Sequence, residues 1–270
     1  MGHTSWYHAA ILIPLRARGA AMKHLEIVER VRPIVEEAGH LALKLREEGL
    51  KIIDKPDGTP VTNADEAVSE FLTHELLAAY PNTRVISEEH ADLSGTNHPL
   101  TWAIDPIDGT KKYCAGKSVW CVMIALFDTQ PIASIIYFPE GPVWYYAERG
   151  KGAYMEDSHG VHKLKVSEPT NPPRFVHAPH FEYPVGELGT YGFMKWTRKL
   201  VWHKIDAYLY SDIGYWDLIP PMLIATEAGG VVVDLHGKPV QLVNPNAVQH
   251  GCILGQPKAV ELALAAIRKH

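Results

Sequence analysis

The sequence has little of what would place the protein in a membrane, in a secretory compartment or on nucleic acid. Its three cysteines, Cys114, Cys121 and Cys252, cannot all pair, and their spacing fits neither a zinc site nor a disulfide framework. No apolar run approaches the roughly 20 residues of a membrane-spanning helix. A net charge of -5 argues against nucleic acid as the main partner. These absences favour a cytoplasmic globular protein without a membrane or nucleic-acid partner.

Cofactor motifs and repeats are absent as well. The chain contains neither Gly-x-Gly-x-x-Gly nor a Walker phosphate loop, so a nucleotide-cofactor fold has no support. The histidine pairs His159/His162 and His177/His180 have ligand-like spacing, but they lie in segments rich in proline and glycine and lack cysteine partners. We therefore expect no zinc site there.

The first 22 residues are expected to form an extension, disordered or added as a tag, ahead of the folded protein. The apolar stretch at 9–15 is short, and Arg16 and Arg18 follow it, which is the wrong order for a secretory signal. The segment contains no acidic residue, which leaves an organellar transit peptide as an alternative. Residues 23–270 are expected to form one domain, with an α+β half to about residue 150 and an α/β half from about residue 160.

Hydrophobic spacing predicts two helices in the N-terminal part. Apolar residues recur at helical spacing over Leu25–Leu45, with Pro33 marking a kink or a start. A second helix is predicted near 63–79, with Thr62 as its N-cap and Asp65 at its third position. Each helix has one apolar face, which is expected to be buried.

The rest of the chain alternates between expected strands and helices. Strands are predicted at 84–87, 101–104, 119–127, 131–138, 143–147, 206–210 and 231–234, and helices around 192–203, over 216–230 and from Pro257 onward. Pro220 and Pro221 are expected in the first helical turn, and residues 155–190 mostly in loops. This arrangement in blocks with hairpins predicts an α/β (α+β) protein of stacked layers.

The stretch most typical of a functional site is Trp102–Thr110, Trp-Ala-Ile-Asp-Pro-Ile-Asp-Gly-Thr. A short apolar strand is expected to enter a tight turn that carries Asp105 and Asp108, stiffened by the intervening proline. Carboxylate oxygens suit a hard cation such as Mg²⁺. Gly109 permits close approach of a ligand, and the N–H groups of Gly109 and Thr110 would face an anion if they open a helix. A metal ion together with a phosphate is the natural pairing.

Three further acidic positions stand at the ends of expected elements. Asp65 opens a helix, Glu88 follows a strand, and Asp217 opens another helix. Each has a structural explanation: Asp65 and Asp217 complement a helix dipole, and the pair Glu88–Glu89 suits a solvated loop. Only the combination of these acids indicates a site.

Taken together, the motifs resemble the inositol monophosphatase superfamily of Mg²⁺-dependent phosphatases. The motifs occur in the family's order, and they are Val61–Asp65, Ser87–Glu89, Trp102–Thr110, Trp216–Asp217 and Glu227–Gly230. The resemblance implies a layered αβαβα sandwich and a phosphomonoesterase that hydrolyses a small phosphorylated metabolite with metal-activated water. It also implies two or three Mg²⁺ ions per site, inhibition by lithium and a homodimer.

The resemblance assigns the metal ligands residue by residue. Glu88, Asp105 and the carbonyl of Ile107 are implied as ligands of a first ion. Asp105, Asp108 and Asp217 are implied as ligands of a second ion, so that Asp105 bridges the two. Two cations about 4 Å apart can bind the attacking and the leaving oxygen of an in-line displacement.

It also assigns the residues around the reacting phosphate. Asp65 and Thr110 are implied to orient the attacking water, with Glu88 contributing to its activation. Asp108 together with the backbone of Gly109 and Thr110 is implied to bind the phosphate.

Substrate preference is less determined. Family members hydrolyse inositol phosphates, histidinol phosphate, 3′-phosphoadenosine 5′-phosphate or sugar phosphates. The segments Lys55–Thr62, Val119–Leu126 and Trp144–Ala153 are similar to histidinol-phosphatase-like members. Tyr210, seven residues before Asp217, stands where inositol-specific members carry an acid, so it is expected to face the substrate. These features favour histidinol phosphate over inositol 1-phosphate.

Lys55 and Glu89 are implied as neighbours of the metals or the substrate. Three alternatives stay open: a 3′(2′),5′-bisphosphate nucleotidase or a sugar phosphatase of the same fold, a catalytically idle regulatory or binding protein on this fold, and a phosphate- or nucleotide-binding module without hydrolysis. Because every side chain in the implied metal site is an acid, the idle protein is disfavoured. The lack of a Walker loop disfavours the module.

Overall fold

The computed structural model describes most of the chain from His24 onward. The described residues are 24–55, 58–90, 98–178, 181, 186–188, 200, 203–243 and 248–269. The expected N-terminal extension, residues 1–22, and most of the helix expected near 192–203 lie outside the described residues. No helix within these ranges is both long enough and apolar enough to cross a bilayer.

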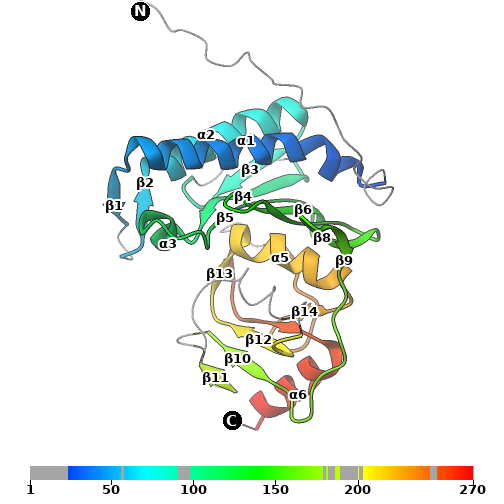
Figure 1. The fold of residues 1–270 in the computed structure, drawn as a ribbon. Helices are drawn as coiled ribbons and strands as arrows, with labels where there is room; N and C mark the ends of the chain where they lie inside the picture. The colour runs from blue at the N-terminus through cyan, green and yellow to red at the C-terminus, as the bar shows by residue number, and fades with distance from the viewer. Residues whose placement is uncertain are drawn as a thin grey trace, which may run out of the picture.

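The described residues form five helices and sixteen strands, most of which are labelled in Figure 1. The helices are α1 (Glu26–Glu48), α2 (Asn63–Ala79), α3 (Thr110–Cys114), α5 (Tyr215–Glu227) and α6 (Pro257–Ile267). The strands are β1 (Ile52–Asp54), β2 (Pro60–Thr62), β3 (Arg84–Ser87), β4 (Thr101–Asp108), β5 (Cys121–Phe127), β6 (Pro131–Phe138), β7 (Val143–Glu148), β8 (Gly152–Asp157), β9 (Gly160–Lys163), β10 (Phe175–His177), β11 (Glu187–Leu188), β12 (Ala207–Tyr210), β13 (Ile213–Gly214), β14 (Val231–Val233), β15 (Val248–Gln249) and β16 (Cys252–Gly255).

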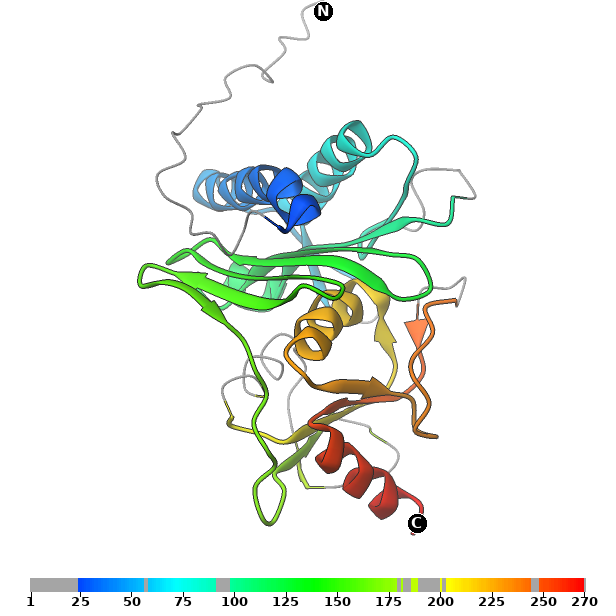
Figure 2. The ribbon, with the colours of Figure 1, turned by 90° about the vertical axis from the view of Figure 1, so that its right-hand side faces the viewer.

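These elements stack in layers. A seven-stranded sheet of order β3-β4-β5-β6-β7-β8-β9 has α1 and α2 on one face and α5 on the other (Figures 1 and 2). A five-stranded sheet of order β11-β10-β12-β16-β14 lies on the far side of α5, and α6 covers its outer face (Figure 2). The predicted αβαβα sandwich is therefore confirmed.

The large sheet separates two hydrophobic cores. Because side chains of a strand alternate between its faces, β5 contributes to both cores and is buried along its whole length. Its residues 121, 123, 125 and 127 pack on the α5 side, whereas residues 122, 124 and 126 pack on the α1 and α2 side. The strand reads as a continuous apolar run for this reason.

The glutamate of the Glu-Ala-Gly-Gly motif joins the end of α5 to the large sheet. The carboxylate of Glu227 accepts hydrogen bonds from the N–H groups of Gly150 and Gly152, both at 2.7 Å. Gly150 lies in the turn between β7 and β8, and Gly152 is the first residue of β8. This motif residue therefore has a structural role in the fold.

Two local predictions were wrong. Residues Asp105–Asp108 were expected in a turn, but β4 continues through them to Asp108. Pro220 and Pro221 are the sixth and seventh residues of α5, beyond its first turn, because this helix begins at Tyr215. The prediction that residues 155–190 lie mostly in loops is confirmed for the described part of this segment, which also contains the end of β8 and the short strands β9, β10 and β11.

Asp206, just before β12, links the segment that precedes β10 to the residue that precedes α6. Its carboxylate is fully buried and accepts hydrogen bonds from Thr170 Oγ1 at 2.6 Å, from the backbone N of Arg174 at 2.7 Å and from Gln256 Nε2 at 3.1 Å. Burial acts to raise the pKa of Asp206, but hydrogen bonds from Arg174 and Thr170 outweigh it and lower the pKa to about 2. The charged carboxylate thus stabilises the folded state.

We expect Asp206→Asn to lower the free energy of unfolding by about 2 kcal/mol near pH 6, since hydrogen bonds to a charged group contribute about 1.5–3 kcal/mol. A carboxyl with a depressed folded-state pKa stabilises above its unfolded value and loses this contribution as the pH falls toward 2. Urea unfolding at pH 6, 4 and 3 should therefore show the difference between wild type and variant shrinking. The exposed-site variant Asp212→Asn is the control, and an equal loss of stability there would contradict this account.

Candidate active site

One extra residue in β4 brings two carboxylates to the same face of the sheet. Asp105 lies opposite Met123 of β5 and Asp108 lies opposite Cys121, so three steps along β4 match two along β5. In a regular strand, residues three apart point to opposite faces. The bulge cancels this alternation, and both carboxylates point toward α5. Pro106 fits here because β3 pairs with β4 only as far as Ile104.

Asp217 completes the group from the first turn of α5. One carboxylate oxygen each of Asp105, Asp108 and Asp217 lies within 4.8 Å of the other two. Asp105 is 1% exposed, and the other two are half-buried. This acidic cluster, Asp105, Asp108 and Asp217, draws on a strand and a helix more than 100 positions apart in the sequence.

Crowding and burial shift the titration of all three acids. Burial, followed by the charges of Glu88, Asp217 and Asp108, raises the pKa of Asp105 well above its usual range. Burial also raises the pKa of Asp217 well above that range, helped by the charges of Glu88 and Asp108. Burial raises the pKa of Asp108 to about 6, although a hydrogen bond from Cys121 acts in the opposite direction. The cluster therefore favours binding of protons or cations.

The site's donor set fits a hard cation. Every group in the cluster is a carboxylate, the ligand type that Mg²⁺ and Ca²⁺ prefer. Oδ1 of Asp105 is buried and has no hydrogen-bond partner within the part of the chain that the structure describes. An ionised carboxylate oxygen in such a place needs a partner, and a cation bound by the cluster would supply it.

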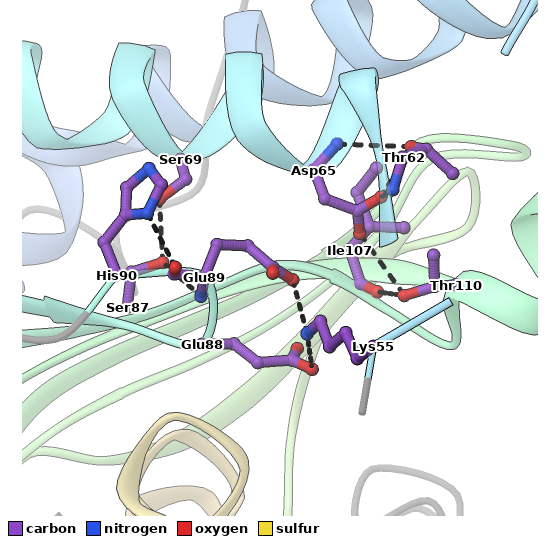
Figure 3. A network of polar contacts seen from close by, with 10 residues as sticks. All are labelled: Lys55, Thr62, Asp65, Ser69, Ser87, Glu88, Glu89, His90, Ile107 and Thr110. Atoms are coloured by element: carbon purple, nitrogen blue, oxygen red, sulfur yellow. Dashed lines mark hydrogen bonds and ion pairs between the residues drawn. The ribbon is translucent and has the colours of Figure 1, made fainter. Parts of the chain in front are cut away.

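Asp65 uses its two oxygens for different purposes. Oδ2 accepts hydrogen bonds from Thr62 N at 2.8 Å and Thr62 Oγ1 at 2.5 Å, which completes the predicted capping box of α2. Oδ1 lies 3.3 Å from Oγ1 of Thr110, and that hydroxyl also lies 3.0 Å from the carbonyl oxygen of Ile107 (Figure 3). Burial raises the pKa of Asp65. The helix cap therefore aims one carboxylate oxygen at the end of β4.

Gly109 turns the chain from β4 into α3. Its φ is +87°, in the left-handed region, and an added Cβ would stand 3.1 Å from the carbonyl oxygen of Val119. As N-cap of α3 it precedes N–H groups that have no acceptor within the helix. The backbone predicted to bind phosphate thus turns sharply directly after Asp108, and its role stays a prediction.

Glu88 lies next to the cluster, bound to a lysine. Its backbone N donates to the carbonyl oxygen of Ile104 at 3.1 Å, which places it beside β4. Its Oε1 is 2.9 Å from Nζ of Lys55, and the same ammonium is 2.9 Å from Oε1 of Glu89 (Figure 3). Burial acts to lower the pKa of Lys55, but the two glutamates outweigh it and raise the pKa. Glu88 is thus close enough to act on the cluster's charges without being one of its three members.

A pair of buried serines supports the turn that carries Glu88. Oγ of Ser69, on α2, lies 2.8 Å from Oγ of Ser87 at the end of β3 (Figure 3). The N–H of Ser87 donates to the carbonyl oxygen of His90 at 3.1 Å, which closes the turn. The sequence pointed to Ser87 only as a motif residue and did not point to Ser69, because two serines far apart carry no recognisable spacing.

Tyr210 is a buried residue of β12. It is 5% exposed, and its ring centroid lies 4.1 Å from that of Tyr208. Burial raises its pKa well above the ordinary value, with smaller effects from Tyr208, Cys252, Asp217 and Asp108. The charges of Asp217 and Asp108 act on Tyr210, so its ring lies near the acidic cluster, and the expectation that it faces the substrate stays a prediction.

The family of the chain follows from comparison with known proteins. The model of the inositol monophosphatase family matches residues 21–185 and 198–270. A histidinol-phosphatase from Streptomyces coelicolor is 31% identical over 215 residues, which are 70% of this chain and 79% of that protein. The 3′(2′),5′-bisphosphate nucleotidase CysQ from Aggregatibacter actinomycetemcomitans is 28% identical over 249 residues, which are 82% of this chain and 91% of that protein.

Comparison with solved structures supports the same fold. The crystal structure of extragenic suppressor protein suhB from Bartonella henselae superposes with a TM-score of 0.74 at 21% identity. The match covers 90% of this chain and 99% of that one. Together with the family match and the acidic cluster, these similarities show that the chain belongs to the inositol monophosphatase family and is a phosphatase.

Proposed function

We propose that the protein is a Mg²⁺-dependent phosphomonoesterase that hydrolyses a small phosphorylated metabolite by direct attack of water. The observation that carries this proposal is the acidic cluster, in which one oxygen each of Asp105, Asp108 and Asp217 lies within 4.8 Å of the others. The main chain of Gly109 stands beside it in a conformation open to an anion. In this proposal the cation and the phosphate would therefore be adjacent.

Two or three ions would be held by residues that are already close together. Asp105, Asp108 and Asp217 would bind one ion, and Asp105 with Glu88 and the carbonyl of Ile107 would bind another. Bound Mg²⁺ would acidify a coordinated water and offset the charge of the phosphate. For Glu88 to take part, its side chain must exchange the ammonium of Lys55 for the metal, because its Oε1 is 2.9 Å from that ammonium.

The other residues orient the reactants. Asp65 Oδ1 and Thr110 Oγ1, 3.3 Å apart, form a pair that can hold a water and accept its proton. The raised pKa of Asp65 suits a proton acceptor. The N–H groups of Gly109 and Thr110 would donate to phosphate oxygens. Glu89 forms an ion pair with Lys55, and this contact would keep the lysine near the cluster.

The substrate is proposed to belong to the histidinol phosphate or inositol phosphate class, with the first favoured. Similarity to a histidinol-phosphatase over 70% of the chain supports this choice. Similarity to CysQ, which extends over 82% of the chain, makes a bisphosphate nucleotide the second candidate. The absence of a carboxylate at Tyr210 weighs against a polyol, because a buried hydroxyl left without its partner costs about 1–3 kcal/mol.

The proposal also includes cytoplasmic location, a homodimer and inhibition by lithium. The homodimer and the inhibition by lithium rest on the family resemblance, and the cytoplasmic location rests on cysteines that fit no disulfide framework.

We expect Asp105→Asn to lower phosphate release by about 10²-fold or more, since the change removes charge from both proposed metal positions while keeping the side chain's shape. The measurement is kcat/KM at saturating Mg²⁺ for wild type and variant. Asp157→Asn removes a carboxylate from the β8–β9 turn, at the opposite edge of the sheet, and should keep wild-type turnover. Retention of more than a tenth of the activity by Asp105→Asn would exclude the bridging role.

In EDTA, the wild-type protein should lose stability as the pH rises from about 4 through 6. The raised pKa values of Asp105, Asp108 and Asp217 mean that the folded state binds more protons than the unfolded state, so stability falls with rising pH. Mg²⁺ should restore it at pH 7, because it binds only the folded site. Urea unfolding at pH 5, 6 and 7 measures this, and Asp108→Asn should flatten the pH dependence. An identical profile for wild type and Asp108→Asn would contradict the model of a strained metal-free cluster.

Wild type should hydrolyse histidinol phosphate at least as efficiently as inositol 1-phosphate. The reason is that position 210 carries a tyrosine and offers no charged acceptor for a hydroxyl group of inositol. The test compares kcat/KM for these two esters and for 3′-phosphoadenosine 5′-phosphate. A tenfold or greater preference for inositol 1-phosphate would show the specificity argument to be wrong. Tyr210→Phe keeps the buried ring, so a changed ratio in that variant would trace the preference to the hydroxyl.

A further inference from the structure

Cys121 is a buried group next to the acidic cluster that the proposed function does not use. It opens β5 directly opposite Asp108 of β4, at the strand pair that follows the bulge. Paired residues of antiparallel strands point to the same face, so the thiol and the carboxylate share the α5 side of the sheet. Cys121 is fully buried, so its thiol faces protein rather than solvent.

The thiol contacts the carboxylate in hydrogen-bonding geometry. Sγ of Cys121 donates to Oδ2 of Asp108 at a distance of 3.6 Å. A carboxylate that a cation binds through one oxygen can rotate about its Cβ–Cγ bond, and a donor on the other oxygen restricts that rotation. Such partners of metal ligands commonly set the affinity of a metal site.

We propose that Cys121 is a positioning residue for Asp108: its thiol holds Oδ2 and thereby turns the other carboxylate oxygen toward the cation bound by Asp108 and Asp217. The inference rests on the proposed function, because it takes Asp108 to be a metal ligand. It assigns to the thiol neither nucleophilic nor redox chemistry. In this proposal the β4 bulge has two effects: it determines the sheet face to which Asp108 points, and it places the thiol that fixes the orientation of the Asp108 carboxylate.

Packing is the competing explanation, because Cys121 also belongs to the core between the large sheet and α5. Substitutions that change the hydrogen-bonding capacity of the side chain separately from its apolar packing distinguish a positioning role from a packing role. Cys121→Val keeps an apolar side chain and loses the donor. Cys121→Ser keeps a donor on a slightly smaller side chain. If packing alone matters, valine should substitute well and serine poorly, and a positioning role predicts the reverse.

The experiment measures binding of Mn²⁺ to wild type, Cys121→Ala, Cys121→Val and Cys121→Ser by electron paramagnetic resonance of the free ion, without substrate. We expect alanine and valine to weaken the metal affinity about 3–10-fold and serine to stay within about twofold of wild type, a smaller effect than the 10–100-fold of strong partners because a thiol is a weak donor. The Mg²⁺ concentration for half-maximal activity should shift in parallel, with kcat at saturation little changed. Cys252→Ala, at a buried cysteine on β16, is the matched control and should bind like wild type.

The outcomes separate this inference from the proposed function. If wild type binds Mn²⁺ and the valine variant binds equally well, or the serine variant binds as weakly as alanine, the positioning role is overturned. If wild type itself binds no Mn²⁺ at millimolar concentration, the proposed function fails, and this inference fails with it. Thermal unfolding in EDTA is measured for each variant to show that it is folded. The Cys121→Val and Cys121→Ser variants decide the question, so the test remains conclusive even if Cys121→Ala does not fold.

Discussion

The site depends on one extra residue in the strand β4. Without it, Asp105 and Asp108 would point to opposite faces of the large sheet, one toward α5 and the other into the core beneath α1 and α2. The bulge places both on the side where α5 begins, and the same register shift sets Cys121 beside Asp108. The Asp-Pro-x-Asp-Gly-Thr sequence is therefore the signature of a bulged strand end, in which proline is tolerated because β3 has already ended.

Gathering these acids destabilises the protein locally, and the surrounding structure compensates. Burial and mutual repulsion raise the pKa of each carboxylate in the acidic cluster. Lys55 offsets part of the negative charge through Glu88 and Glu89. The rigid parts lie around the cluster: the capping box of α2, the serine pair beneath Glu88, and two hydrophobic cores. A cation in the cluster would relieve the remaining repulsion, so a bound ligand would stabilise the geometry that the surrounding structure imposes.

Local signals in the sequence were sufficient for much of the fold. The capping box at Thr62 and Asp65 and the start of α6 at Pro257 depend on residues within one helical turn, and both were predicted correctly. What could not be predicted depends on partners distant in the sequence. The bulge is defined by pairing between β4 and β5, so the stretch was taken for a turn. The burial of Tyr210 depends on Tyr208 and on the β12–β16 pairing. The spacing between Tyr210 and Asp217 in the sequence contains no information about either.

The same long-range organisation separates the proposed metal ligands from Tyr210, the residue proposed to influence substrate preference. Asp105 and Asp108 come from the large sheet, and Glu88 follows a neighbouring strand of it. Tyr210 belongs to the five-stranded sheet on the other side of α5. Asp217, at the start of α5, connects the two layers, because it joins the carboxylates of the large sheet while its charge acts on Tyr210. Residues of the second sheet can therefore change without disturbing the bulge, provided that α5 keeps its position. A fold built in this way can retain one hydrolytic centre while the group attached to the phosphate varies.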